Sequence, residues 1–363
     1  WSCSLTENCK IDHPTSDILM EQQMKEGKYK KAEKYYDSIF EGVETESLPL
    51  PDVSGKIPEK GITSREVNIP EEKIRAYCEK AGVTPNTLFT GLFGILATKY
   101  SNSEDSLFAT IYNGRNDSRL ENTVCMLVKT LPVYCAFEEK TTIQTYMAEL
   151  SEQLMSSMAN DIFPFYDICA KYGINSDFVF AYQAELSDDY PIGDTIARGQ
   201  DLSLDMAKMP LLIQVREYDH EYVLTAEYRS DMYSKAFVDG MLEAYEAAMA
   251  SMLKSKYISE ISVISPNAVN QIATFNSTEN DYGRSKTIFN MFSEMAREIP
   301  ERTAVVFKDK RYTYKELDKI SDRLGKYIAS LGIGREDVVS ILIPRCEYMA
   351  IAPLGVIKAG AAY

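Results

Sequence analysis

One arginine in this sequence occupies a position from which its side chain could bind a ligand. Arg115 ends the tripeptide N-G-R, directly after the apolar run S-L-F-A-T-I-Y at 106–112. That run predicts a buried strand, and a residue just beyond the end of such a strand often points into a cleft. A guanidinium held there can bind a carboxylate through two parallel hydrogen bonds. Arg115 is therefore a candidate binding residue, with an ordinary turn arginine as the alternative.

The two histidines give a weaker signal. His13 lies in the sequence D-H-P, and His220 lies in D-H-E at an expected hairpin turn. Neither has a second histidine beside it, and the seven cysteines contain no C-x-x-C pair. A lone histidine is more often a solvated side chain than a catalytic or metal-binding one. We therefore predict surface histidines and no metal site in this chain.

A phosphate site is also not predicted. Binding a phosphate needs several consecutive backbone N–H groups that face one anion, usually supplied by glycines and small hydroxyl residues. The nearest pattern is Gly332-Ile333-Gly334, which follows an expected helix and predicts a helix C-cap and turn. We expect no cofactor to be bound by this chain itself.

Alternating helices and strands without an internal repeat are predicted between residues 20 and 265. Helical spacing or capping residues favour helices at 20–40, 70–82, 84–96, 143–158 and 234–252. Apolar or alternating runs favour strands at 106–112, 123–137, 177–183, 211–218 and 221–229, and the last two flank a tight turn. Residues 1–19 form a lead-in segment, and the polar stretch 266–285 predicts a surface linker.

The last part of the chain, 286–363, predicts the opening of an α/β sheet. A hairpin is expected at 303–307 and 311–314, then a helix over 317–328, a buried strand at 337–343 and a second apolar helix at 347–359. Such a short stretch is too small to close a core. We therefore expect the sequence to end inside a domain.

Composition excludes several classes of protein. An apolar fraction of 45% supports a folded core, and the net charge of −15 argues against nucleic acids and anionic membranes as partners. Residues 286–363 carry 13 basic and 10 acidic side chains, which leaves −18 on the rest and supports a boundary near 285. No stretch is long and apolar enough for a membrane span or a signal peptide. Unpatterned cysteines favour a reducing, cytoplasmic location.

The end of the chain resembles the start of adenylation domains of nonribosomal peptide synthetases. The resemblance rests on Y-T-Y-K-E-L, I-L-I-P-R-C-E-Y and I-K-A-G-A-A-Y, in that order, after I-F-N-M-F-S-E-M-A-R-E-I-P-E-R-T-A-V. It implies the N-terminal part of an adenylate-forming domain, similar to acyl-CoA synthetases. The parent enzyme would use ATP and Mg²⁺, but the motifs that bind ATP in that family do not occur here.

The larger part resembles the C-terminal lobe of a condensation domain, the peptide-bond-forming unit of such synthetases. The carrying stretches are V-T-P-N-T-L-F-T-G-L-F-G-I-L-A-T-K-Y, A-T-I-Y-N-G-R, V-C-M-L-V-K-T-L-P-V-Y, N-D-I-F-P-F-Y-D-I and D-L-S-L-D-M. The implied fold class is α/β, one lobe of a two-lobed chloramphenicol-acetyltransferase-like enzyme. Its substrates would be aminoacyl or peptidyl groups held as phosphopantetheine thioesters on peptidyl carrier proteins, and these carrier domains would be its partners.

The resemblance also implies roles for individual residues. The family's catalytic H-H-x-x-x-D-G motif belongs to the other lobe and is absent from this sequence, so this chain alone is expected to be inactive. Arg115 would brace the aspartate of that motif, and Met126 and Thr130 match positions near the substrate channel. Where the family often has R-D-x-S-R-N-P-L, this chain has Gln200, Leu204 and Met209 in place of both arginines and the asparagine, which puts acceptor-side contacts in doubt.

Two alternatives stay open. A coenzyme A-dependent acyltransferase could share this lobe, but it would need a histidine-bearing lobe and would have no adenylation start. A noncatalytic platform for carrier proteins would need a basic or apolar patch, and the −18 charge of the lobe argues against a strong electrostatic one.

Overall fold

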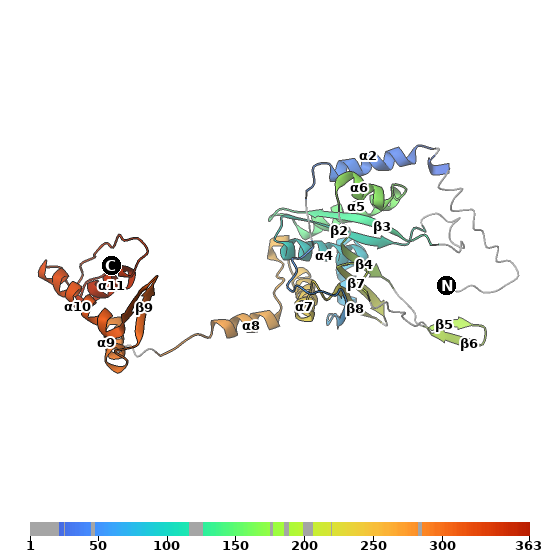
Figure 1. Cartoon of the computed structure of the whole chain (residues 1–363). Helices are drawn as coiled ribbons and strands as arrows, with labels where there is room; N and C mark the ends of the chain where they lie inside the picture. Colours follow the sequence, from blue (N-terminus) through green and yellow to red (C-terminus); the bar gives the residue numbers. More distant parts are fainter. Residues whose placement is uncertain are drawn as a thin grey trace. The chain divides into compact units, whose positions relative to one another are not determined.

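The computed structural model describes residues 22–24, 26–44, 48–115, 126–174, 177–184, 189–198, 206–218, 220–281 and 285–363. The chain divides into a larger unit, 1–274, and a smaller unit, 275–363 (Figure 1).

A mixed six-stranded sheet forms the centre of the larger unit. Its strands are β1 (Lys60–Glu66), β2 (Asp105–Tyr112), β3 (Lys129–Ala136), β4 (Phe178–Gln183), β7 (Leu211–Tyr218) and β8 (Glu221–Arg229), in the spatial order β1-β8-β7-β4-β2-β3. β4 pairs in parallel with β2 and with β7, whereas the other pairs are antiparallel. The carboxyl ends of β2, β4 and β7 therefore lie at one edge of the sheet. A separate hairpin joins β5 (Asp189–Ile192) and β6 (Thr195–Arg198).

One face of the sheet carries the main core. It packs against α3 (Glu71–Ala81), α4 (Pro85–Ser101), α5 (Ile143–Ala159) and α7 (Lys235–Met252). Every side chain of α4 from Thr87 to Thr98 is buried, as its all-round apolar sequence predicts. Thr84 starts this helix, because its hydroxyl accepts a hydrogen bond from the N–H of Thr87 at 3.1 Å. The Phe93 ring then packs on both β2 and β4, with its centroid 4.8 Å from that of Phe108 and 4.7 Å from that of Phe180.

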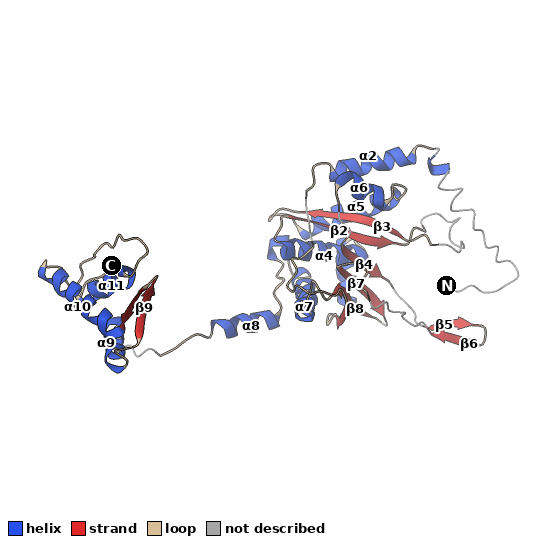
Figure 2. Cartoon of the chain, viewed as in Figure 1, coloured by secondary structure: helices blue, strands red, loops and turns tan. Residues whose placement is uncertain are grey.

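The opposite face is only partly covered. Over β2 and β3 it packs against α2 (Lys28–Phe40) and α6 (Phe165–Tyr172), which form a second apolar cluster with Leu107 (Figure 2). Over β4, β7 and β8 this face is more open, since the described helices that contact these strands, α4 and α7, belong to the main core on the other face. The side chains of β7 alternate accordingly between buried and half-buried. This uncovered part of the sheet is where a ligand can reach the strands.

The smaller unit contains the hairpin and the two helices expected at 317–328 and 347–359, and a further helix at 288–298 that the sequence patterns did not predict. β9 (Thr303–Phe307) pairs with β10 (Lys310–Thr313), and α10 (Tyr314–Ser330) packs against both strands. The other two helices, α9 (Ile288–Glu298) and α11 (Tyr348–Lys358), pack against α10. Thr313 and Glu316 form a capping box at the start of α10. Pro353 lies inside α11 without ending it.

The prediction of a buried strand at 337–343 is wrong. In this segment only Val338 forms a β-bridge, with Ala362, and Val338 and Leu342 are 74% and 99% exposed. A strand needs neighbours for its backbone groups, and the smaller unit as described supplies almost none here.

Other differences are smaller. The linker stretch begins with a helix, α8 (Pro266–Asn276), that has no buried residue, after the short turn η2 (Ile258–Glu260). The sequence patterns did not predict β1, α6 or the β5–β6 hairpin. Parts of the helix expected at 20–40 and of the strand expected at 123–137 lie outside the described residues, as does the lead-in segment 1–19.

Candidate functional site

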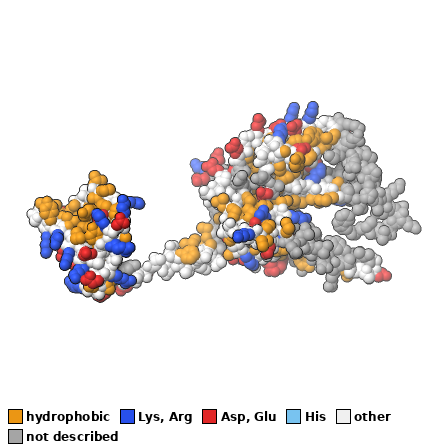
Figure 3. All heavy atoms as spheres, in the orientation of Figure 1, with side chains coloured by type: hydrophobic (Ala, Val, Ile, Leu, Met, Phe, Trp, Pro, Cys, Tyr) orange, Lys and Arg blue, Asp and Glu red, His pale blue; other side chains and the backbone are white. Residues whose placement is uncertain are grey.

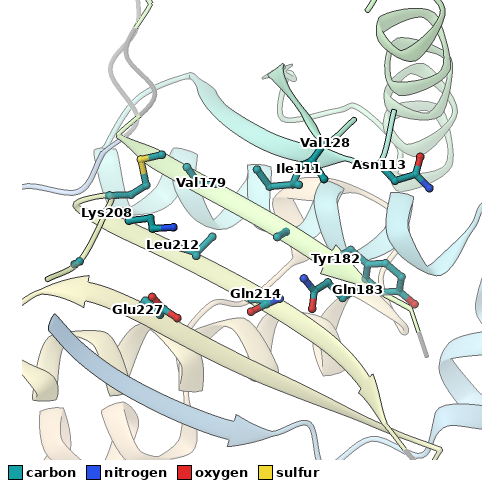
Figure 4. Close-up of a pocket in the computed structure, with 13 residues that line it drawn as sticks. Ile111, Asn113, Val128, Val179, Tyr182, Gln183, Lys208, Leu212, Gln214 and Glu227 are labelled. Atoms are coloured by element: carbon teal, nitrogen blue, oxygen red, sulfur yellow. The ribbon is translucent and has the colours of Figure 1, made fainter. Parts of the chain in front are cut away.

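A groove of about 410 Å³ lies on the uncovered part of the sheet (Figure 4). Its lining residues are Ile111, Asn113, Val128, Val179, Ala181, Tyr182, Gln183, Ala207, Lys208, Met209, Leu212, Gln214 and Glu227. The floor is apolar, while the carboxamides of Asn113, Gln183 and Gln214 stand toward one end and Lys208 toward the other. This is the size and mixture of surfaces found in small-molecule sites.

The turn that bears Arg115 adjoins the groove. The backbone N–H of Arg115 donates to the side-chain oxygen of Asn113 at 3.0 Å, and Asn113 itself lines the groove. Gly114 has φ +68°, and a Cβ added there would lie 1.9 Å from the carbonyl oxygen of Leu127. The glycine thus brings the turn against the segment that leads into β3, which places Arg115 and Val128 near the same edge of the sheet.

Thr130 and Met126 are not among the lining residues of the groove. Thr130 is half-buried on β3 and is the cross-strand partner of Ile111, a lining residue. Met126 is 89% exposed. Of the three residues at the variant motif, Gln200 and Leu204 lie outside the described part, and Met209 is a lining residue.

Sequence patterns missed the polar residues of the groove. Gln183 ends β4, and Gln214 lies in the middle of β7 with Leu212 on the same face. The only signal for them was alternation, because a polar residue between buried neighbours must point to the other side of the sheet. That signal does not say whether the other side is solvent or a binding site.

Behind the groove wall, a chain of charged contacts runs from β4 to the β7–β8 turn. The Tyr182 hydroxyl donates to Glu217 Oε2 at 2.9 Å, and Glu217 forms an ion pair with Arg75. Arg75 also pairs with Glu71, whose other oxygen lies 3.0 Å from Nδ1 of His220. Glu71 and Glu217 are 8% and 9% exposed, so the guanidinium offsets two almost buried carboxylates.

These contacts shift pKa values in directions with clear causes. The hydrogen bond from Arg75 holds the pKa of Glu71 below its usual value, and His220 adds to this effect. Burial, and then the hydrogen bond to Glu217, raise the pKa of Tyr182, so its hydroxyl stays a proton donor at neutral pH. His220 is solvated, as predicted, since its side chain is 87% exposed, yet it also bonds Glu71. His13 lies outside the described residues.

We expect this cluster to make the stability of the larger unit depend on acid pH. A carboxyl whose pKa is lowered in the fold stabilises it fully above the unfolded value, about 4.3 for glutamate, and loses this contribution as pH falls through the folded pKa. Glu71→Gln should therefore flatten the acid side of the stability–pH curve, measured by chemical denaturation from neutral pH downward. Glu79→Gln is the matched control, because Glu79 is an exposed glutamate on the same helix. An acid limb equally steep in wild type and in Glu71→Gln would contradict the assignment.

The glycine turn of the smaller unit does not fit a phosphate. Gly332 has φ +82° and donates its N–H to the carbonyl of Ala329 at 3.0 Å, while the N–H of Gly334 donates to Asp337 Oδ2 at 2.8 Å. Both N–H groups are already bonded, so the C-cap prediction is confirmed. Among the described residues, no cluster of metal-binding side chains and no helix able to cross a membrane is found.

Comparison with known families agrees with this arrangement. The condensation-domain model matches residues 12–272, and the model of AMP-binding enzymes matches residues 292–363. Surfactin synthase subunit 1 of Bacillus subtilis (strain 168) is 26% identical over 98% of this chain, and tyrocidine synthase 2 of Brevibacillus parabrevis is 25% identical over 92%. The chain spans about a tenth of the length of each, 10% in both cases.

Solved structures show the same fold. A four-domain nonribosomal peptide synthetase bound to AMP and glycine superposes with a TM-score of 0.72 at 18% identity, covering 92% of this chain and 27% of that one. The first condensation domain of the calcium-dependent antibiotic synthetase gives a TM-score of 0.54 at 13% identity, covering 68% of this chain and 56% of that one. The predicted α/β fold class is confirmed. The chain belongs to the condensation-domain family of nonribosomal peptide synthetases and continues into the start of an adenylation domain.

Proposed function

We propose that the groove is this lobe's wall of a condensation channel, in which an amine on one carrier protein attacks a thioester on another. The main observation in support of this proposal is that three motif-like stretches, far apart in the sequence, meet at one groove. Asn113 comes from A-T-I-Y-N-G-R, Val128 from V-C-M-L-V-K-T, and Met209 from the stretch after D-L-S-L-D-M. In the reaction a C–N bond forms, the C–S bond of the thioester breaks, and the freed thiol takes the proton that the amine gives up.

The lining residues suit a phosphopantetheine-linked substrate. The apolar floor, made of side chains such as Val179 and Leu212, can pack against the aliphatic parts of the arm. The carboxamides of Asn113, Gln183 and Gln214 can both donate to and accept from amide groups, which the arm and a peptide contain. The role of this lobe is therefore to orient the reacting groups, which lowers the barrier by fixing their geometry.

The acid–base chemistry is assigned to the other lobe of the condensation domain. Arg115 is proposed to brace the catalytic aspartate of that lobe, and the chain alone is proposed to be inactive. We propose ATP and Mg²⁺ as ligands of the complete adenylation domain. The glycine turn of the smaller unit is not proposed as their site, because its N–H groups are already bonded within the chain. We propose carrier-protein domains as partners and the cytoplasm as location. The described cysteines Cys78, Cys135, Cys169 and Cys346 are free thiols, which supports a reducing compartment.

Filling the groove tests this proposal. Gln214 is half-buried and lines the groove, so Gln214→Trp in the complete module should block the channel. We expect condensation to fall at least about tenfold, the effect of roughly 1.4 kcal/mol on a barrier. Amino-acid-dependent pyrophosphate exchange should stay at the wild-type rate, because that reaction belongs to another domain.

The matched control is Ser64→Trp. Ser64 points to the same side of the sheet but lies on β1, two strands away from Gln214, and does not line the groove. Condensation by Gln214→Trp at the rate of Ser64→Trp would reject the groove as the channel. Acyl transfer from free coenzyme A thioesters with no need of a carrier would favour the acyltransferase alternative instead.

A further inference from the structure

A basic stripe runs along the solvent side of α2. Lys30, Lys31 and Lys34 are exposed, and Lys28 flanks them with its side chain 52% exposed. Lys and Arg side chains stand out over α2 at the top of the larger unit in Figure 3. The buried residues Ala32, Tyr36 and Phe40 follow one another at intervals of four, so the three lysines lie on the opposite side of the helix.

These lysines are not neutralised by their neighbours. Lys28 lies 3.3 Å from Glu26, but within the described ranges no ion pair involves Lys30, Lys31 or Lys34. The two acidic residues of α2, Glu33 and Asp37, instead pair with Lys171 of α6, at 2.8 and 2.7 Å. Like charges three and four residues apart also destabilise a helix, so this spacing is unfavourable for the helix itself.

The stripe sits on a rigid support. The hydroxyl of Tyr29 donates to Asp167 Oδ2 at 2.9 Å, that of Tyr35 to the carbonyl of Gln153 at 3.1 Å, and that of Tyr172 to Asp37 Oδ1 at 2.7 Å. Tyr36 is fully buried in the cluster beneath. These contacts fix the backbone of α2, and with it the spacing of the positions from which the lysines project, which favours recognition of an equally regular partner.

We propose that the solvent side of α2 is a docking surface for a carrier-protein domain that presents an acidic helix. Charge complementarity supports the proposal. Lys30, Lys31 and Lys34 form no ion pair within the described part of the chain, and they make a positive strip on a chain whose net charge is −15. A helix with carboxylates at three- and four-residue spacing matches the spacing of Lys30, Lys31 and Lys34. Nucleic acids and anionic membranes fit less well, since they are bound through larger basic surfaces and would be repelled by the rest of the chain. The identity of the partner rests on the proposed function.

Neutralising the stripe tests the surface. In the full chain, the triple variant Lys30→Gln, Lys31→Gln, Lys34→Gln should bind the holo carrier-protein domain of the same synthetase about tenfold more weakly at low salt, as expected for three exposed charges. The difference should shrink at high salt. The control is Lys73→Gln, Lys80→Gln, Lys99→Gln, which removes the same charge from exposed positions on α3 and α4. Circular dichroism and thermal unfolding verify that both variants fold.

Each outcome decides one point. Equal carrier affinity of the stripe variant and the control variant overturns the docking surface. The proposed function can stand in that case, because Gln214→Trp tests the groove independently of carrier affinity. No carrier binding by wild type overturns it as well, and loss of condensation on filling the groove is then the separate measure of the proposed function. Duplex DNA and phosphatidylglycerol vesicles are run in parallel. If wild type binds either of them and the stripe variant does not, the assignment of an acidic protein partner is wrong.

Discussion

Replacing Gly114 by alanine should destabilise the edge of the sheet that carries the candidate site. Gly114 has φ +68°, where a Cβ costs about 1–2 kcal/mol, and the new methyl group would lie 1.9 Å from the carbonyl oxygen of Leu127. A clash with backbone cannot be relieved by a rotamer change, and overpacking adds about 1–3 kcal/mol. We expect a total loss of about 2–5 kcal/mol, measured by hydrogen exchange of the β2 and β3 amides in the full chain.

Gly173→Ala separates the two causes. Gly173 follows α6 with φ +70° and has nothing within 4 Å of an added Cβ, so it should lose only the backbone part, about 1–2 kcal/mol. Equal losses in the two variants would mean that the contact between Gly114 and Leu127 does not hold this edge together. A larger loss for Gly114→Ala would show that the turn before Arg115 is built against the entry to β3.

Replacing Arg115 by alanine in the complete synthetase should give the largest loss of activity. If the arginine braces a carboxylate of the other lobe, its removal leaves that charge unpaired in a closed channel, at a cost of about 3–5 kcal/mol. Condensation should then fall by at least about a hundredfold. Adenylation, followed by pyrophosphate exchange, should not change, because the missing side chain lies in the condensation domain.

Arg115→Lys distinguishes geometry from charge. Lysine keeps the positive charge but cannot form two parallel hydrogen bonds to one carboxylate, so it should recover only part of the lost rate. Condensation at the wild-type rate in Arg115→Ala would leave Arg115 as a residue that only shapes the turn with Asn113.

The sequence alone determined most of the local structure. The hairpin strands predicted at 211–218 and 221–229 are β7 and β8 to the residue, and Thr84 and Ser234 cap the helices expected after them. Such features depend on side chains a few positions apart, namely alternation in strands, three- and four-residue spacing in helices and hydroxyls at helix starts. The position of Arg115 just beyond a buried strand followed from the same local patterns.

Only the tertiary structure decided which elements meet. β4 lies between β2 and β7, which places Gln183 and Gln214 at the groove with Asn113, although nothing near these residues in the sequence specifies that pairing. The contacts of Tyr182, Glu217 and Arg75 likewise join β4, β7 and α3. At 337–343 the apolar pattern predicted a strand, but a strand forms only where neighbouring strands accept its backbone hydrogen bonds, and the described residues provide a single bridge. Helices and caps are satisfied within one segment of chain, whereas sheets and the sites on them depend on partners that are distant in the sequence.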